Sequence, residues 1–160
     1  MDRPPVVVRE ARRGDEARLG ELLRLGALDG SADGVERPGA LRAALDEILA
    51  TPGSTVLVAE CGGEVVGLCQ LVTFRHLQAG GGRCAELESV HVHPAWRSRG
   101  VGGQLLEAAV ERADRLGCYR VQLTSNRARP DAHRFYVAHG FVPSHVGFKR
   151  LLRRDDQAPG

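Results

Sequence analysis

The sequence predicts an α/β protein of the α+β kind, with a single mixed central sheet of six to seven strands and helices on both faces. Two observations predict this class. Short β-branched runs alternate with amphipathic stretches in the order strand, two helices, three strands, helix, strand, helix, strands. In addition, a strand, a helix and a strand follow one another over residues 86–124, and such a crossover joins parallel strands.

The first half of the chain is predicted from its periodicity. Leucines recur at helical spacing after Asp15 and again after Pro38, and the Asp29–Gly34 segment between them is rich in helix breakers. β-branched and apolar runs predict strands on either side of a Gly-Gly hairpin turn. The expected elements are strand 6–8, helices from 15 and from 38, strand 55–60, turn 61–64, and strand 65–77, which is long enough to contain a bulge.

The second half is predicted in the same way. A glycine-rich stretch suggests a flexible connection, Gly117 is the expected helix C-cap, and Pro130 suits the first turn of a helix. The expected elements are connection 79–83, strand 86–92, helix 101–116 with an apolar face that includes Leu116, strand 119–124, helix 130–138, and two final strands at 141–142 and 146–152.

Length and composition indicate one domain, residues 1–155, with a frayed tail at 156–160. The 22 basic residues are scattered and balanced by 20 acidic ones, which argues against a nucleic-acid partner. Four cysteines without a Cys-x-x-Cys pair favour the reducing cytoplasm, and Cys69 and Cys84 are expected in the core. The N-terminal sequence has no apolar run suited to a signal peptide or membrane span.

The stretch 86–117 joins a strand, a basic glycine-rich turn and an amphipathic helix. Free backbone N–H groups and the helix dipole make such a helix N-terminus an anion site, and Arg97 and Arg99 lie on its approach. A P-loop would need a Gly-Lys pair, and a Rossmann fingerprint would need glycine where Leu105 stands. The turn therefore predicts a phosphate-bearing ligand of another kind.

Three segments resemble the GCN5-related N-acetyltransferase family, in the order typical of that family. The pattern Arg97-x-x-Gly100-x-Gly102 resembles its acetyl-coenzyme A loop, Val90-His91-Val92-His93-Pro94 resembles the strand before it, and Phe135-Tyr136 with Gly140-Phe141 resembles its "FY…GF" segment. The resemblance covers nearly the whole chain and is weakest over residues 1–50. It implies the acyl-coenzyme A N-acyltransferase fold, with acetyl-CoA as the acyl donor.

The resemblance also implies how the cofactor is held. The backbone of Val90, His91 and Val92 would pair with the pantetheine arm, which requires the end of this strand to be splayed from its parallel neighbour. Asn126 and Arg129 are alternative contacts to the cofactor arm, because the family's usual asparagine position is Arg129 here. The diphosphate would lie on the turn formed by Arg97, Ser98, Arg99, Gly100, Val101, Gly102 and Gly103.

Acetyl transfer to an amine requires a base, since an ammonium group has no free lone pair. Glu86 and Glu88 lie two residues apart on the strand, so both should project to one face, the face of Val90 and Val92. Both match glutamate positions within the family. Glu88 is favoured as the base because it is nearer the thioester end, and Glu86 remains the alternative.

The thiolate that departs requires an acid, and Tyr136 occupies the family position of that proton donor. No cysteine or serine motif calls for a covalent enzyme intermediate. No metal is expected, because His91 and His93 have no further ligand at suitable local spacing.

The sequence therefore predicts an acetyl-CoA-dependent N-acetyltransferase that acts directly on a primary amine. The acceptor would be an amino acid, polyamine, amino sugar, drug or protein N-terminus. The alternative is a non-catalytic module that binds or senses acyl-CoA. The family resemblance is also compatible with a homodimer, and neither a membrane nor nucleic acid is an expected partner.

Overall fold

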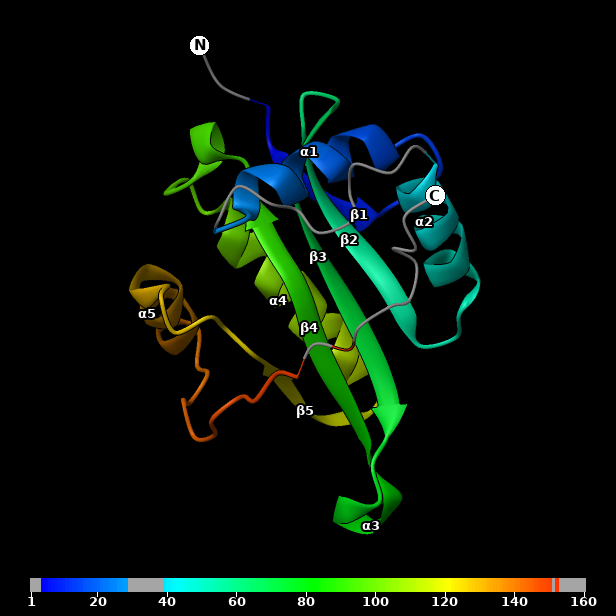
Figure 1. Cartoon of the computed structure of the whole chain (residues 1–160), viewed down its shortest axis with the longest axis vertical. Helices are drawn as coiled ribbons and strands as arrows, with labels where there is room; N and C mark the ends of the chain where they lie inside the picture. The colour runs from blue at the N-terminus through cyan, green and yellow to red at the C-terminus, as the bar shows by residue number, and fades with distance from the viewer. Residues whose placement is uncertain (1–3, 29–38, 151, 153–160) are drawn as a thin grey trace, which may run out of the picture. The chain divides into compact units, whose positions relative to one another are not determined.

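The computed structural model describes residues 4–28, 39–150 and 152, and these form two compact units, 1–123 and 124–160. The first unit contains a mixed sheet with the strand order β1-β2-β3-β4-β5 (Figure 1). The bounds are β1 Val6–Glu10, α1 Glu16–Gly26, α2 Ala40–Ala50, β2 Ser54–Cys61, β3 Glu64–Arg75, α3 Gln78–Gly81, β4 Arg83–Val92, a 3₁₀ turn Pro94–Trp96, α4 Val101–Arg115 and β5 Cys118–Leu123. The second unit has one helix, α5 Pro130–Ala138, within its described residues.

The predicted elements of the first unit are confirmed, with small shifts at their ends. The first four strands are antiparallel neighbours in sequence order, and β5 pairs with β4 in parallel. The loop expected at 29–34 and the helix start at Pro38 lie outside the described residues. Connection 79–83 differs from the prediction, since its first part forms the short helical turn α3 with left-handed backbone at Ala79 and Gly80.

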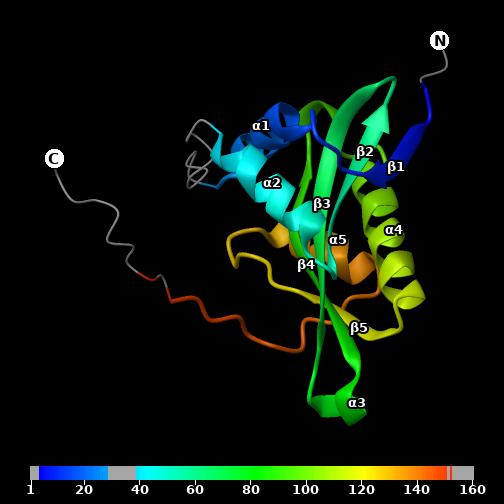
Figure 2. The same ribbon diagram turned by 90° about the vertical axis from the view of Figure 1, so that its right-hand side faces the viewer.

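The sheet has a helical layer on each face (Figure 2). Helices α1 and α2 cover one face with a core that contains Leu19, Leu22, Leu45, Val56, Val58 and Leu68. Helix α4 covers the other face with Val101, Leu105, Leu106, Ala109 and Ala113, all buried. Leu116 was expected on this apolar face but is 44 % exposed, because α4 ends one residue before it.

The cysteines expected in the core are confirmed there. Cys69 and Cys84 are fully buried, and burial raises the pKa of the Cys69 thiol to about 12. A thiol with so high a pKa stays protonated and unreactive near neutral pH. Cys69 is therefore a packing residue.

The prediction of six to seven strands is wrong for the described residues, which contain five. Residues 141–150 form no strand, and their apolar side chains are exposed, with Phe148 95 % and Val142 78 % exposed. A β-branched run becomes a strand only when a neighbouring backbone pairs with it, and Pro143 removes one donor from this segment. Sequence preference alone was therefore misleading here.

Candidate functional site

A bulge interrupts β4 at the place where the sequence predicts the base. Gln70 of β3 lies opposite Glu88, and Leu68 lies opposite His91, so an interval of two residues on β3 spans three on β4. Ser89 takes a left-handed φ of 53° within this interval. A bulge inserts one residue and bends the strand, and bulges are frequent beside active sites. The end of β4 is therefore bent at Ser89.

The bulge changes which side chains share a face. Side chains of directly opposed residues point to the same side of a sheet. Glu88 therefore shares the face of Gln70, and His91 follows on that same face, which α1 and α2 cover. Val92 lies opposite Gly67 and faces α4. The expectation that the carboxylates share a face with the valines is therefore wrong, because the extra residue reverses the alternation between them.

The ladder between β4 and β5 ends just before the bulge. Their parallel pairing ends where Leu87 lies opposite Leu123, and residues 88–92 pair with β3 alone among the described strands. β5 itself ends at this pair, so the splay of β4 from its parallel neighbour stays a prediction. The edge of β4 that turns away from β3 carries backbone groups with no described strand beside them, which is what strand-like pairing with an extended ligand requires.

The turn after β4 is fixed by local contacts. The 3₁₀ turn begins where the Ala95 N–H donates to Nδ1 of His93, at 3.2 Å. Arg97 Nε then donates to the Val92 carbonyl oxygen at 3.1 Å, which holds the turn against the end of the strand. Ser98 and Gly100 have φ values of 56° and 79°, and Gly100 is the residue that precedes α4. The left-handed φ at Gly100 favours glycine there.

This turn has the electrostatics of an anion site. The first backbone N–H groups of α4 have no intrahelical acceptor and carry the positive end of the helix dipole. Arg97 and Arg99 are exposed beside them, and the Arg99 guanidinium lies 5.7 Å from the centre of the Trp96 ring. Val101, by contrast, is buried and anchors the start of the helix in the core. The turn can therefore hold a phosphate group with backbone and guanidinium donors.

The two carboxylates differ in their surroundings. Glu86 is half-buried, and its Oε2 accepts a hydrogen bond of 2.6 Å from Nε2 of Gln122 on β5. Glu88 is exposed and stands at the bulge, beyond the last pair of the β4–β5 ladder. Glu86 therefore lies beside the closed part of the ladder, and Glu88 beside the open part.

Sequence reasoning missed two residues of β5, Arg120 and Gln122, that lie beside Glu86 on the same face of the sheet. Cys84 Sγ donates to Oε1 of Gln122 at 3.6 Å, which orients the amide so that its nitrogen faces Glu86. Arg120 Nε donates to Cys84 Sγ at 3.5 Å, and this hydrogen bond raises the pKa of Arg120 above its ordinary value. A period-2 reading of β5 could have found them, since polar Arg120 and Gln122 alternate with Val121 and Leu123.

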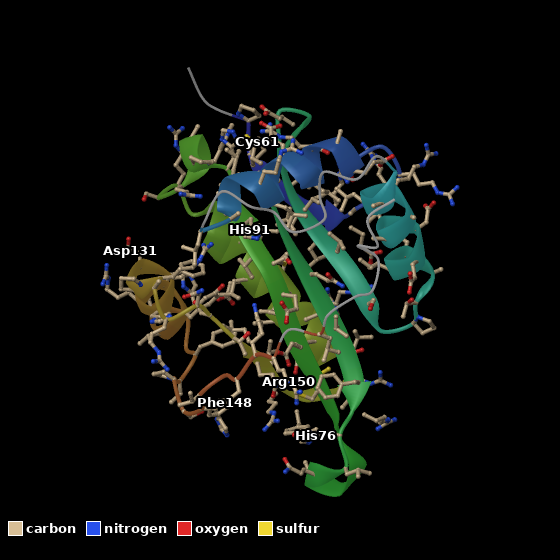
Figure 3. The ribbon with its side chains drawn as sticks, viewed as in Figure 1. Cys61, His76, His91, Asp131, Phe148 and Arg150 are labelled. Carbon is tan, nitrogen blue, oxygen red and sulfur yellow. The ribbon has the colours of Figure 1, made fainter. Side chains whose placement is uncertain are left out.

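His91 is fixed against the end of α1. A Cβ built on Gly26 would lie 2.0 Å from Nδ1 of His91, so a larger residue at 26 would collide with the imidazole. His91 lies where α1 passes over β4 (Figure 3). Its side chain therefore contacts α1 at the bulge end of β4, while its backbone belongs to the open edge of the strand.

The second unit carries the remaining predicted residues. Tyr136 is a half-buried residue of α5, and its ring centre lies 5.3 Å from that of Phe135 and 5.9 Å from that of Phe141. Asn126 builds the turn before α5, because its Oδ1 accepts from the Ala128 N–H at 2.9 Å and its carbonyl oxygen accepts from the Arg129 N–H at 3.0 Å. The Asn126 side chain thus shapes the segment that positions Arg129.

Two other features of the described residues bear on the location of the site. A cavity of about 360 Å³ lies at the C-terminal end of α4, and none of the predicted site residues lines it. The described residues contain neither a group of three or more metal-ligating side chains nor a helix long and apolar enough to cross a membrane. The candidate site is therefore the region around the β4 bulge and the turn that follows.

Comparisons with known proteins agree with this geometry. An aminoalkylphosphonate N-acetyltransferase of Salmonella typhimurium is 38 % identical over 90 residues, 56 % of this chain and 58 % of that protein. A rice protein named "Probable glucosamine 6-phosphate N-acetyltransferase 2" is 33 % identical over 61 % of this chain and 51 % of its own. The matches thus span about half the length of these curated relatives.

A structural relative covers more of the chain. The crystal structure of a transcriptional regulator from Bacillus halodurans superposes with a TM-score of 0.86 at 36 % identity, over 92 % of this chain and all of that one. The sequence model of the Acetyltransferase (GNAT) family matches residues 25–141, which include the bulge, the glycine turn and α5. With a mixed sheet, a bulged β4 and a glycine turn before α4, the chain belongs to the GNAT acetyltransferase family.

Proposed function

We propose that this protein is an N-acetyltransferase that moves an acetyl group from acetyl-CoA directly to a primary amine. The observation that carries the proposal is the junction of β4 and α4, where an open strand edge is followed, after one 3₁₀ turn, by a glycine turn at a helix N-terminus. Such a junction suits a ligand with an extended amide arm and a diphosphate. We propose that residues 1–155 act as one acetyltransferase domain.

The coenzyme would bind by two kinds of contact. The backbone of residues 90–92 would pair with the pantetheine amides, and Arg97 to Gly103 would hold the diphosphate through N–H groups, with the exposed arginines beside them. Asn126 or Arg129 would add a contact to the arm. Support for these roles comes from the open edge of β4, the left-handed turn at Gly100 and family membership.

The reaction would proceed by direct attack. Glu88, with Glu86 as the alternative, would take a proton from the ammonium group, directly or through water, so that the nitrogen lone pair can attack the thioester carbon. The C–S bond then breaks as the C–N bond is completed. Tyr136 would protonate the thiolate, the second amine proton would leave to water, and exchange with water would restore the Tyr136 phenol and the carboxylate. The products are the N-acetylated amine and coenzyme A.

The acceptor would be a small amine. Two curated relatives are named for N-acetylation of an aminoalkylphosphonate and of glucosamine 6-phosphate, and a third is named a mycothiol acetyltransferase. The two carboxylates on one face of β4 support a cationic acceptor, since ammonium groups pair with carboxylates. An amino acid, polyamine, amino sugar or drug falls within this class, and a protein N-terminus is the alternative acceptor.

Release of free thiol from acetyl-CoA, measured with a panel of primary amines, tests the proposal. Acetyltransfer to at least one amine, with kcat/KM above about 10³ M⁻¹s⁻¹, is the expected result, since most enzymes exceed this efficiency on their own substrates. Tight coenzyme A binding by calorimetry without thiol release from any amine would favour the alternative, a non-catalytic module that binds or senses acyl-CoA. Absence of both binding and release would contradict either function.

A further inference from the structure

One polar surface on the α1 face of the sheet extends from the bulge to the start of β5. Glu86 lies opposite Gln122, and Cys84 lies opposite Arg120, so their side chains point to the same side as Glu88. The printed contacts agree with this register, since Gln122 binds Glu86 and Arg120 binds Cys84. A row of two carboxylates and one guanidinium therefore runs along this face.

The contacts described for the Arg120 guanidinium come from a thiol and an aromatic ring. Its Nε donates to Cys84 Sγ, and its Cζ lies 5.3 Å from the centre of the Tyr119 ring. The Tyr119 hydroxyl is itself hydrogen-bonded to Nδ1 of His76 at 2.9 Å. Within the part of the chain that the structure describes, no acidic side chain forms an ion pair with Arg120. Arg120 is an exposed residue.

The spacing of the charges suits one kind of acceptor. Gln122 is the partner of Glu86, and Arg120 lies two residues before Gln122 on the same strand. Arg120 and Glu86 are therefore offset by about 7 Å along the strands. A guanidinium presents paired donors that match a phosphonate, phosphate or carboxylate. A molecule with an ammonium group at one end and an oxyanion several bonds away could therefore contact a carboxylate and Arg120 together.

We propose that the acceptor is a primary amine that also carries an oxyanion, and that Arg120 binds the oxyanion while the amine lies at the β4 carboxylates. This inference rests on the proposed acetyltransferase function and specifies its substrate class. Gln122 is a positioning residue in this arrangement, because it fixes Glu86 between Arg120 and the bulge.

The test compares matched acceptors. Thiol release is measured with 2-aminoethylphosphonate against propylamine, with glucosamine 6-phosphate against glucosamine, and with β-alanine against its methyl ester. We expect kcat/KM to be at least about 30-fold higher for the anionic member of one pair, which corresponds to one charged hydrogen-bonded contact. The Arg120→Gln variant should lose most of that ratio, and Arg120→Lys should recover part of it, since lysine keeps the charge without the fork.

Arg115→Gln is the matched control, because Arg115 is also an exposed arginine, lies on α4 at the other face of the sheet and is paired with Glu111 at 4.0 Å. It should keep the wild-type ratio, and the thermal midpoint of all variants should stay within about 2 °C. Equal rates within every pair, or a ratio unchanged by Arg120→Gln, would overturn the inference while the acetyltransferase function stands. Absence of thiol release from any amine would remove both.

Discussion

Gln122 of β5 donates a hydrogen bond from Nε2 to Oε2 of Glu86 on β4, across the last closed part of the parallel ladder. Glu88 lies two residues further on, at the bulge and beside the open edge. One oxygen of Glu86 thus accepts a hydrogen bond within the sheet, whereas Glu88 lies at the bulge, where the thioester is proposed to lie. Which of the two carboxylates is the base stays a prediction, and Glu88 is favoured for its position.

The first prediction concerns the identity of the base. Glu88→Gln should lower kcat/KM by about 100-fold or more, the usual effect of losing a general base, and Glu86→Gln by less than about tenfold. Steady-state thiol release with the best acceptor measures both. Glu107→Gln, an exposed carboxylate on α4, is the control for the loss of one negative charge. The opposite order of effects would identify Glu86 as the base.

The second prediction concerns Tyr136. Tyr136→Phe should lower kcat by about 100-fold, because the thiolate loses its proton donor, while the Kd of coenzyme A changes by less than about twofold. The phenylalanine ring keeps the contacts with Phe135 and Phe141, so the fold of this unit should persist. Turnover and calorimetry together separate the two effects. A normal kcat would exclude Tyr136 as the acid.

The third prediction concerns the glycine turn. Gly100→Ala places a Cβ on a residue with φ of 79°, which costs about 1 kcal/mol even though the nearest atom is 4.0 Å away. Gly117→Ala is a matched control, with φ of 72° and open space around it at the other end of α4. Both variants should lose similar stability in urea unfolding. Only Gly100→Ala should also raise the KM for acetyl-CoA, and an equal effect of both variants would contradict the phosphate role of this turn.

The fourth prediction concerns Gly26 and His91. Gly26→Ala should destabilise the protein by about 1–3 kcal/mol, because the new methyl group overlaps the imidazole. His91→Ala combined with Gly26→Ala should recover much of this loss. Urea unfolding of the four proteins in a double-mutant cycle measures the coupling. Additive effects would mean that the cost of Gly26→Ala does not arise from the overlap with His91.

The fifth prediction concerns the buried Asp15. The hydrogen bond from Arg9 lowers the pKa of this carboxyl below its ordinary value, with help from the Arg12 N–H. A carboxyl with a lowered folded-state pKa stabilises the protein above its unfolded pKa of about 3.9, and this contribution is lost as the pH falls through the folded-state pKa. Asp15→Asn should therefore cost about 1–3 kcal/mol at pH 7.

The pH dependence of Asp15→Asn shows whether the carboxylate charge causes the loss of stability. The difference in unfolding free energy between wild type and Asp15→Asn should be constant from pH 8 to about pH 5 and should shrink as the pH approaches 2. Arg13→Gln is a control, since Arg13 pairs with Asp46 on the exposed surface. A difference that stays constant down to low pH would mean that the carboxylate charge contributes nothing.

The order and type of nearly all elements of the first unit were determined by the sequence, because periodicity, breakers and caps act locally. The turn at Gly100 was predicted from its local glycine pattern, and the parallel β4–β5 pair was predicted because a strand–helix–strand crossover joins parallel strands. The final strands were not predictable, because a strand forms only against a partner and residues 141–150 have none among the described strands.

Tertiary structure alone decided what the face of β4 presents. Alternation predicts that Glu88 and Val92 share a face, but the residue inserted at Ser89 sends them to opposite faces. The register of β5 likewise decides that Gln122 meets Glu86 and that Arg120 meets Cys84. Sequence periodicity reflects the spacing of residues along a single strand. A bulge and a strand register depend also on the backbone of the neighbouring strand.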